Sequence, residues 1–152
     1  MSNSLSKNER LKSYKRIRIL FAEGEKFRVS PLLVYFRVDS KVEGVEEVEG
    51  GASSLVPRPS SLLQMGVSVS SRHFKRAVDR NLLKRRIREA YRTQKYELKK
   101  LLEEKGITMD IFFVYIEPEI RDYDNIHQSM TNALKSLTQK VISISQFPSP
   151  NS

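Results

Sequence analysis

The fold is decided by residues 67–92, which read VSVSSRHFKRAVDRNLLKRRIREAYR. The stretch opens with a strand-like alternation, passes through a basic turn and then predicts a helix from about Lys75 to Thr93. One apolar stripe runs along that helix, because residues three or four positions apart share a face. The members of the stripe are Leu83, Ile87, Ala90 and Tyr91. The stretch therefore predicts a strand followed by a helix that packs on a sheet.

The face opposite the stripe is almost purely cationic. It carries Asn81, Arg85, Arg88 and Arg92, with Lys84 at its flank. Residues 72–92 hold nine Lys or Arg against two acidic residues, and so many like charges repel one another unless an anion relieves them. A guanidinium group matches phosphate oxygens with paired hydrogen bonds. The pattern indicates a nucleic-acid-binding surface, with a solvated basic helix face as the alternative.

Strands are predicted on both sides of this stretch. Residues 62–70 alternate between apolar and polar side chains, which is typical of a half-buried strand. In residues 32–38 the alternation places Leu32, Val34, Phe36 and Val38 on one face and Leu33, Tyr35 and Arg37 on the other. Residues 109–117 (MDIFFVYIE) alternate little, which favours a central strand.

Helices are predicted at both ends of the chain. Residues 8–23 carry apolar side chains at three- and four-residue steps, and Gly24 is a plausible stop. From Asp124 onward the sequence is strongly amphipathic, with Ile126, Met130, Ala133, Leu134, Leu137 and Val141 on one side. Residues 94–105 either continue the basic helix or form a second one that ends at Gly106.

These elements predict an α+β fold, a small two-layer sandwich in the order αβββαβα with helices packed on a central mixed sheet. Residues 1–152 are expected to form a single RNA-binding domain, because the chain is too short for two good cores. Residues 39–61 have no helix or strand period and contain several acids, glycines and prolines, which predicts a flexible acidic loop. The tail, about residues 145–152, is expected to be disordered.

Composition excludes several classes of protein. The chain has 152 residues, a formal charge of +9, no cysteine and only two histidines, which removes thiol catalysis and disfavours a zinc site. No apolar run is long enough for a transmembrane helix, and the N-terminus lacks the apolar core of a secretion signal. We therefore predict a cytoplasmic protein without membrane contact.

The sequence also lacks an obvious catalytic set. Asp110, Glu117 and Glu119 are interpreted as solvated acids at a strand edge rather than as an acid–base pair, so no catalytic or metal-binding residue is predicted. His73 lies in the basic turn, where it contacts phosphate or is incidental; His127 is expected at the surface or core edge. A helix-turn-helix would need a short helix before the basic helix, and a strand stands there instead, so RNA is favoured over DNA.

Residues 67–92 resemble the bacterial ribonuclease P protein component. That family carries a strand ending in Val-Ser, a basic turn and then the pattern Ala-Val-x-Arg-Asn-x-x-Lys-Arg-x-Ile/Leu-Arg-x-Ala-Phe/Tyr, which residues 77–91 match. The resemblance extends to Arg10-Leu11-Lys12, Ile17, Phe21 and Gly24, to Tyr35, to residues 110–118 and to the final helix. This chain departs from the family pattern in three places. Leu82 stands where many members have a third basic residue, and the basic turn is about one residue longer than in some members. The acidic loop is also longer than usual.

The resemblance implies a fold like that of a ribosomal-protein or elongation-factor domain, with a left-handed βαβ crossover. It also implies a protein subunit of ribonuclease P, which assists a catalytic RNA in removing the 5′ leader from precursor tRNA. In this family the RNA subunit performs the chemistry and holds the Mg²⁺ ions, so the protein is expected to bind RNA and to supply no catalytic residue.

Two binding surfaces follow from the resemblance. The first should hold the catalytic RNA through Arg72, Lys75, Arg76, Arg80, Asn81, Lys84, Arg85 and Arg88. The second should be a cleft between the first helix and the open sheet face, and should hold the leader through Phe21, Leu33 and Tyr35, with Lys15, Ser68 and Ser70 as further members. Ordinary core packing is the alternative for Phe21.

Two other functions remain open on the sequence. A ribosome-associated or generic structured-RNA-binding protein would carry a similar basic helix. A self-sufficient nuclease would need clustered carboxylates or histidines for metal, which the sequence does not provide.

Overall fold

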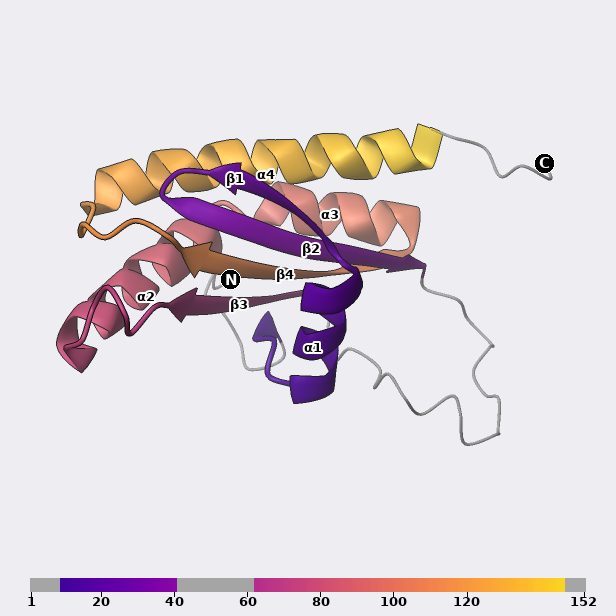
Figure 1. Ribbon diagram of the computed structural model, residues 1–152. Helices are drawn as coiled ribbons and strands as arrows, with labels where there is room; N and C mark the ends of the chain where they lie inside the picture. Colours follow the sequence, from indigo (N-terminus) through magenta and orange to yellow (C-terminus); the bar gives the residue numbers. More distant parts are fainter. Residues whose placement is uncertain (1–8, 41–61, 147–152) are drawn as a thin grey trace.

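The computed structural model describes residues 9–40 and 62–146 of the chain. Four strands and four helices follow one another along it (Figure 1). They are α1 (Tyr14–Glu23), β1 (Glu25–Val29), β2 (Leu32–Ser40), β3 (Leu63–Val69), α2 (Ala77–Arg92), α3 (Tyr96–Lys105), β4 (Ile107–Tyr115) and α4 (Tyr123–Gln146). The predicted α+β class is confirmed.

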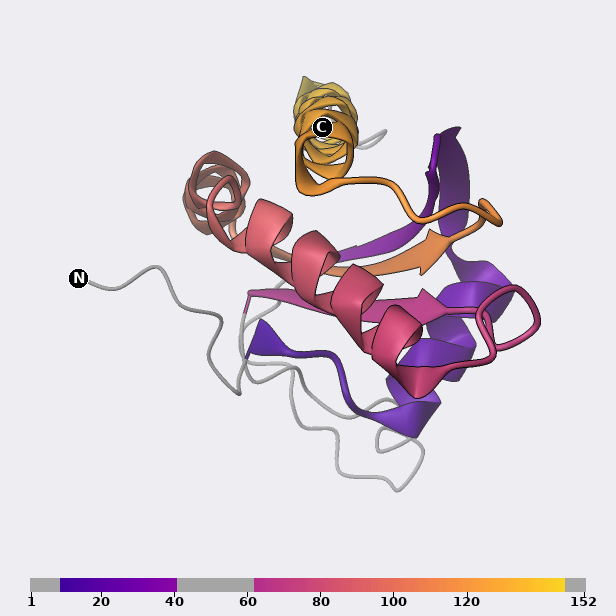
Figure 2. The same ribbon diagram turned by 90° about the vertical axis from the view of Figure 1, so that its left-hand side faces the viewer.

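The four strands form one mixed sheet in the order β1-β2-β4-β3. β1 and β4 both pair with β2 in antiparallel fashion, whereas β3 pairs with β4 in parallel fashion. Helices α2, α3 and α4 lie on one face of the sheet and α1 lies on the other (Figures 1 and 2). Figure 1 views the sheet from the side of α1. In this view the arrows of β3 and β4 point left, β4 lies above β3, and the helices α2 and α3 that connect these two strands lie behind the sheet. That arrangement is the left-handed crossover that the family resemblance implies.

The main core lies between the sheet and the three helices on its far side. The predicted inward residues of β2, Leu32, Val34 and Phe36, are buried there. So is the entire apolar stripe of α2, made of Leu83, Ile87, Ala90 and Tyr91. From α4, all six predicted residues from Ile126 to Val141 are buried as well. The predicted inward residues named here for β2, α2 and α4 are therefore confirmed, whereas in β3 the predicted outward Gln64 is buried and the predicted inward Val67 is only half-buried.

The first helix is shorter than predicted. It begins after Ser13, whose Oγ accepts a hydrogen bond from the Arg16 backbone N–H at 3.3 Å. The residues before it are extended, because Leu11 N–H donates to the Met65 carbonyl at 2.8 Å and so joins the segment to β3. Glu9 fixes the same segment to α3 through a buried ion pair with Lys95 at 2.6 Å.

The other boundaries differ in smaller ways. Residues 94–105 do form a second helix, α3, and Gly106 ends it in the left-handed region at φ 70°. The predicted loop starts later, since Asp39 and Ser40 belong to β2, and residues 41–61 lie outside the described part of the chain. The predicted tail also starts later, because α4 reaches Gln146 and only residues 147–152 lie outside. Within the described residues no helix is both long and apolar enough to cross a bilayer.

Candidate nucleic-acid interface

The basic turn and the polar face of α2 present most of the predicted phosphate-binding residues to solvent. Arg72, Lys75, Arg76, Asn81 and Arg85 are exposed, and Lys84 and Arg88 are half-buried. Leu82, the position at which many family members carry a basic residue, is half-buried on the same helix. The predicted cations therefore lie in the turn before α2 and along the helix itself, and most of them reach solvent.

Arg80 holds the turn in shape rather than simply projecting from it. Its Nη1 donates to the Phe74 carbonyl at 2.7 Å and to the Lys75 carbonyl at 3.0 Å. The Phe74 side chain is buried and packs on the Tyr115 ring at 5.9 Å. The turn is thus tied to the core at one point and cross-linked to α2 at another, which fixes the cations around it.

Two other arginines of α2 have protein partners. Arg86 Nη1 donates to the Arg121 carbonyl at 2.5 Å and joins α2 to the loop before α4. Arg92, which sequence reasoning placed on the cationic face, pairs with Glu89 at 2.5 Å, and this hydrogen bond lowers the pKa of the Glu89 carboxyl. Among the described residues, the basic side chains of α2 that no ion pair or hydrogen bond engages are therefore Lys84, Arg85 and Arg88.

Arg10 is an addition that sequence reasoning missed. Partial burial, and then the charge of Arg10, lower the pKa of the Arg88 guanidinium from its usual value. The extended segment that pairs with β3 thus brings a second cation close to α2. Within residues 9–40 and 62–146 neither arginine has an ion pair, so the two charges favour an anion between them. In the sequence, the cluster of basic residues from Lys7 to Arg18 was the feature that could have indicated a role for Arg10.

A second surface lies on the opposite face of the sheet. Strand pairing sets two rows of neighbours across it: Lys26, Tyr35, Phe112 and Gly66 form one row, and Arg28, Leu33, Val114 and Ser68 form the next. Directly paired residues share a face of a sheet. Apolar and aromatic side chains therefore occupy the middle of this face, cations lie at its β1 edge, and a serine lies at its β3 edge.

Phe21 of α1 completes an aromatic cluster on this face. Its ring centroid lies 4.6 Å from that of Tyr35 and 5.1 Å from that of Phe112. Phe21 is still 43% exposed, so it is not an ordinary core residue. Lys26 Nζ lies 5.9 Å from the centroid of the Tyr35 ring. Aromatic rings combined with cations are what a single-stranded nucleic acid needs for stacking and charge neutralisation.

The predicted members of this cleft divide into two groups. Phe21, Leu33, Tyr35 and Ser68 come together as expected, and Ser70 follows β3, where its Oγ accepts from the Arg72 backbone N–H at 3.0 Å. Lys15 does not join them, because it lies roughly 120° around α1 from Phe21. Its role in binding the leader stays a prediction.

The structure adds Lys26, Arg28, Phe112 and Val114 to this surface. The signal for Phe112 and Val114 was the two-residue period inside MDIFFVYIE, which places them on the face opposite Ile111 and Phe113. No sequence pattern indicated Lys26 and Arg28, because they reach this face only through the pairing of β1 with β2.

Gly66 makes room for the Phe112 ring. A Cβ at this position would lie 2.6 Å from Phe112 Cε2 and 2.7 Å from Cδ2. We predict that Gly66→Ala displaces the ring and destabilises the fold by about 1–3 kcal/mol, the usual range for overpacking. Urea unfolding measures the loss. An unchanged free energy of unfolding would mean that the ring moves aside without cost.

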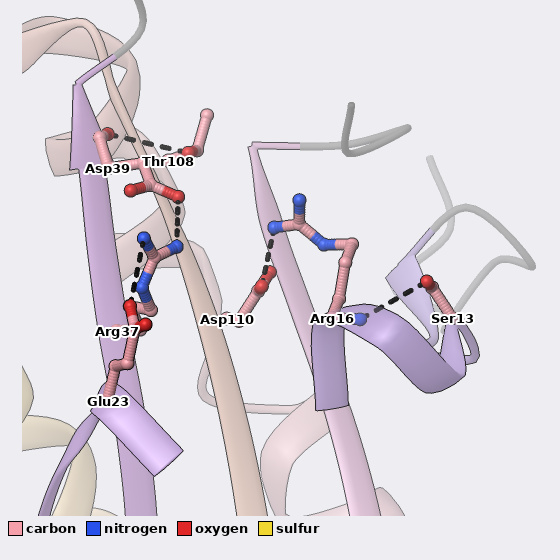
Figure 3. A network of polar contacts seen from close by, with 7 residues as sticks. All are labelled: Ser13, Arg16, Glu23, Arg37, Asp39, Thr108 and Asp110. Atoms are coloured by element: carbon pink, nitrogen blue, oxygen red, sulfur yellow. Dashed lines mark hydrogen bonds and ion pairs between the residues drawn. The ribbon is translucent and has the colours of Figure 1, made fainter. Parts of the chain in front are cut away.

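A buried ion pair fixes α1 on the sheet. Arg16 Nη2 lies 2.5 Å from Asp110 Oδ2, and the two side chains are only 4% and 5% exposed. Figure 3 shows Arg16 reaching from α1 to β4, with Glu23, Arg37 and Asp39 linked alongside. Burial raises the pKa of the Asp110 carboxyl, and the Arg16 guanidinium acts against that rise. The prediction of Asp110 as a solvated strand-edge acid is wrong, because α1 covers it.

The other candidate acids and histidines also have structural settings. Glu117 pairs with Arg121 at 2.6 Å, and Glu119 lies 3.7 Å from the same arginine. His73 is exposed in the basic turn, and the His127 ring lies 5.6 Å from the ring of Tyr123. In the part of the chain that the structure describes, no three His, Asp or Glu side chains gather as metal ligands would. Glu117 and Glu119 are therefore engaged by Arg121.

Comparison with known proteins agrees with this geometry. The model of the family Ribonuclease P matches residues 5–139. The ribonuclease P protein component of Porphyromonas gingivalis is 36% identical over 130 residues, which cover 86% of this chain and 83% of the relative.

Solved structures share the fold. The ribonuclease P protein of Thermotoga maritima superposes with a TM-score of 0.57 at 22% identity, covering 84% of this chain and 96% of that one. The Staphylococcus aureus protein gives 0.55 at 20% identity, covering 85% and 94%. The chain therefore belongs to the ribonuclease P protein family, the protein component of the ribonucleoprotein enzyme that processes the 5′ end of tRNA.

Proposed function

We propose that this protein binds the catalytic RNA of ribonuclease P through the basic turn and α2, and binds the 5′ leader of precursor tRNA in the cleft between α1 and the sheet. One observation carries the proposal: α1 and α2, which carry residues of the two proposed surfaces, lie on opposite faces of one sheet (Figure 2). One small protein is then able to contact the ribozyme and the substrate at the same time.

The chemistry of each surface suits its proposed ligand. The α2 surface offers guanidinium and ammonium groups with few aromatic rings, and phosphate contacts of this kind position a folded RNA without reading its sequence. The proposed leader surface offers the exposed Phe21 ring and the half-buried Tyr35 ring, with Lys26 at the edge and the buried Phe112 ring packed beneath them. Stacking on such rings tolerates any base, which suits leaders of varied sequence.

We further propose that the Mg²⁺ ions used in cleavage are held by the RNA partner. Asp110 and Glu117, the best-placed acids of this chain, are engaged by Arg16 and Arg121, and a carboxylate already neutralised by an arginine is a poor metal ligand. The proposed location is the cytoplasm, where a bacterial cell holds its precursor tRNA.

The decisive functional experiment is reconstitution. The protein is added to the catalytic RNA from the same cell at low magnesium, and cleavage of precursor tRNA is measured. We expect the protein to restore cleavage under conditions in which the RNA alone is slow. Cleavage by protein alone would indicate a self-sufficient nuclease, and no stimulation would favour a structured-RNA-binding protein without a processing role.

Tyr35→Ala tests the leader cleft. Losing one stacked base costs about 1–3 kcal/mol, so we expect the variant holoenzyme to bind precursor tRNA roughly tenfold more weakly while its affinity for mature tRNA is unchanged. Tyr35→Phe, which keeps the ring, should behave as the parent protein. An equal loss for both substrates would place the leader elsewhere.

A further inference from the structure

We infer that the single-strand path does not end at the aromatic cluster but continues along α1 over a stripe formed by Tyr14 and Arg18, which binds leader nucleotides farther from the cleavage site. This inference rests on the proposed leader cleft and adds a second subsite to it. The occupant is single-stranded RNA, the same strand that the cluster is proposed to hold.

The stripe is continuous with the cluster. Tyr14, Arg18 and Phe21 stand at positions i, i+4 and i+7 of one helix, which places them on one side of α1. The two ends of the stripe are separated by roughly 10 Å along the helix axis. Arg16 and Leu20, which face the sheet, are buried on a different side. A strand leaving the cluster therefore meets Arg18 and then Tyr14.

The two residues form a ready-made stacking platform. Tyr14 is 72% exposed, and the Arg18 guanidinium carbon lies 5.6 Å from the centroid of its ring. The contact leaves most of the ring open to a base, while the guanidinium is free to meet a phosphate. The same pairing of a ring with a cation occurs at Tyr35 and Lys26 in the proposed cleft.

Charge complementarity selects the occupant. Among the residues that the structure describes, Arg18 has no ion pair, and neither do Lys12 and Lys15 nearby. Arg16, in the same helix, is neutralised by Asp110. The outer surface of α1 is thus cationic and carries the exposed rings of Tyr14 and Phe21, which matches a polyanion that carries bases and does not match an apolar partner.

A second exposed tyrosine provides the matched control. Tyr96 of α3 is 68% exposed, and within the described ranges no cation lies over its ring. Helix α3, which carries Tyr96, lies on the face of the sheet opposite α1 (Figures 1 and 2). A general effect of deleting an exposed tyrosine ring would therefore appear equally at Tyr96 and at Tyr14.

The test measures the affinity of the reconstituted holoenzyme for precursor tRNAs whose leaders are lengthened one nucleotide at a time. With the parent protein, affinity should rise as the leader first reaches the cluster and again as it reaches the stripe. Tyr14→Ala and Arg18→Ala should each abolish the second rise, which makes long leaders roughly five- to tenfold weaker. Binding of short leaders and of mature tRNA should not change, and Tyr14→Phe and Tyr96→Ala should match the parent.

Several results would overturn the inference. The first is a Tyr14→Ala holoenzyme whose affinity depends on leader length as the parent's does. The second is an equal loss of affinity for short and long leaders. The third is a variant that loses affinity only for the catalytic RNA. Urea unfolding of each variant shows whether α1 remains folded, and Arg18→Ala, which leaves the ring in place, tests the path if Tyr14→Ala is unstable. If Tyr35→Ala removes the first rise and the second rise survives both substitutions, only the extension fails. If Tyr35→Ala has no leader-dependent effect, the cleft itself is misplaced.

Discussion

Charge reversal of Arg85 and Arg88 together is expected to weaken binding of the catalytic RNA by at least roughly 100-fold at low salt, since two lost charge-assisted contacts of about 1.5–3 kcal/mol each remove about 3–6 kcal/mol. Arg85 is exposed, and Arg88 lies close to Arg10 without an ion pair in the described part of the chain. Arg85 and Arg88 test RNA binding more cleanly than Arg80 does, because replacing Arg80 would also break its hydrogen bonds to the Phe74 and Lys75 carbonyls in the basic turn.

The salt dependence separates this explanation from a folding defect. Each phosphate contact contributes nearly one unit to the slope of log affinity against log salt, so the double variant should lose about two units of slope. Filter binding at several salt concentrations measures it. A matched control reverses Lys105 and Lys135, which are exposed on α3 and α4. If the control loses as much affinity and slope, the interface does not lie on α2.

Removing Asp110 is expected to produce the largest loss of stability. Asp110→Ala leaves the Arg16 guanidinium, only 4% exposed, without its carboxylate, and breaking one side of a buried pair typically costs about 3–5 kcal/mol. Urea unfolding at neutral pH measures the free energy. Because Arg16 joins α1 to the sheet, the variant should also lose the difference in affinity between precursor and mature tRNA.

Two further variants show whether the pair itself is responsible. Arg16→Met combined with Asp110→Leu removes both charges and should recover most of the stability, because replacing a buried pair by apolar groups is often neutral. Glu117→Ala breaks a more exposed pair with Arg121 and should cost less than about 1 kcal/mol. A loss at Glu117 as large as that at Asp110 would contradict the special role of burial.

The helix α2 shows how far local pattern extends. Its apolar stripe and its cationic face were predicted residue by residue, because both depend only on a fixed rotation per residue. The faces of β2 and the buried side of α4 were predictable for the same reason. The first helix was predicted six residues too long, because Arg10 forms a parallel bridge with Met65 and the Leu11 backbone N–H donates to the Met65 carbonyl, which ties the segment before Ser13 to β3.

The cleft shows where local pattern stops. Tyr35 and Phe21 were identifiable, whereas Lys26 and Arg28 were not, because their position depends on which strand pairs with β2. Asp110 reads as a solvated acid in the sequence, and only the docking of α1 makes it the buried partner of Arg16.

The sequence by itself determined that one amphipathic basic helix packs on a sheet and presents guanidinium groups outward, since helical periodicity is a property of neighbouring residues. Only the tertiary structure decided which rings and cations share the other face of the sheet, and which of the described arginines are engaged by ion pairs. Those outcomes depend on the strand order β1-β2-β4-β3 and on ion pairs that join residues as many as 94 positions apart. No local periodicity encodes contacts at such separations.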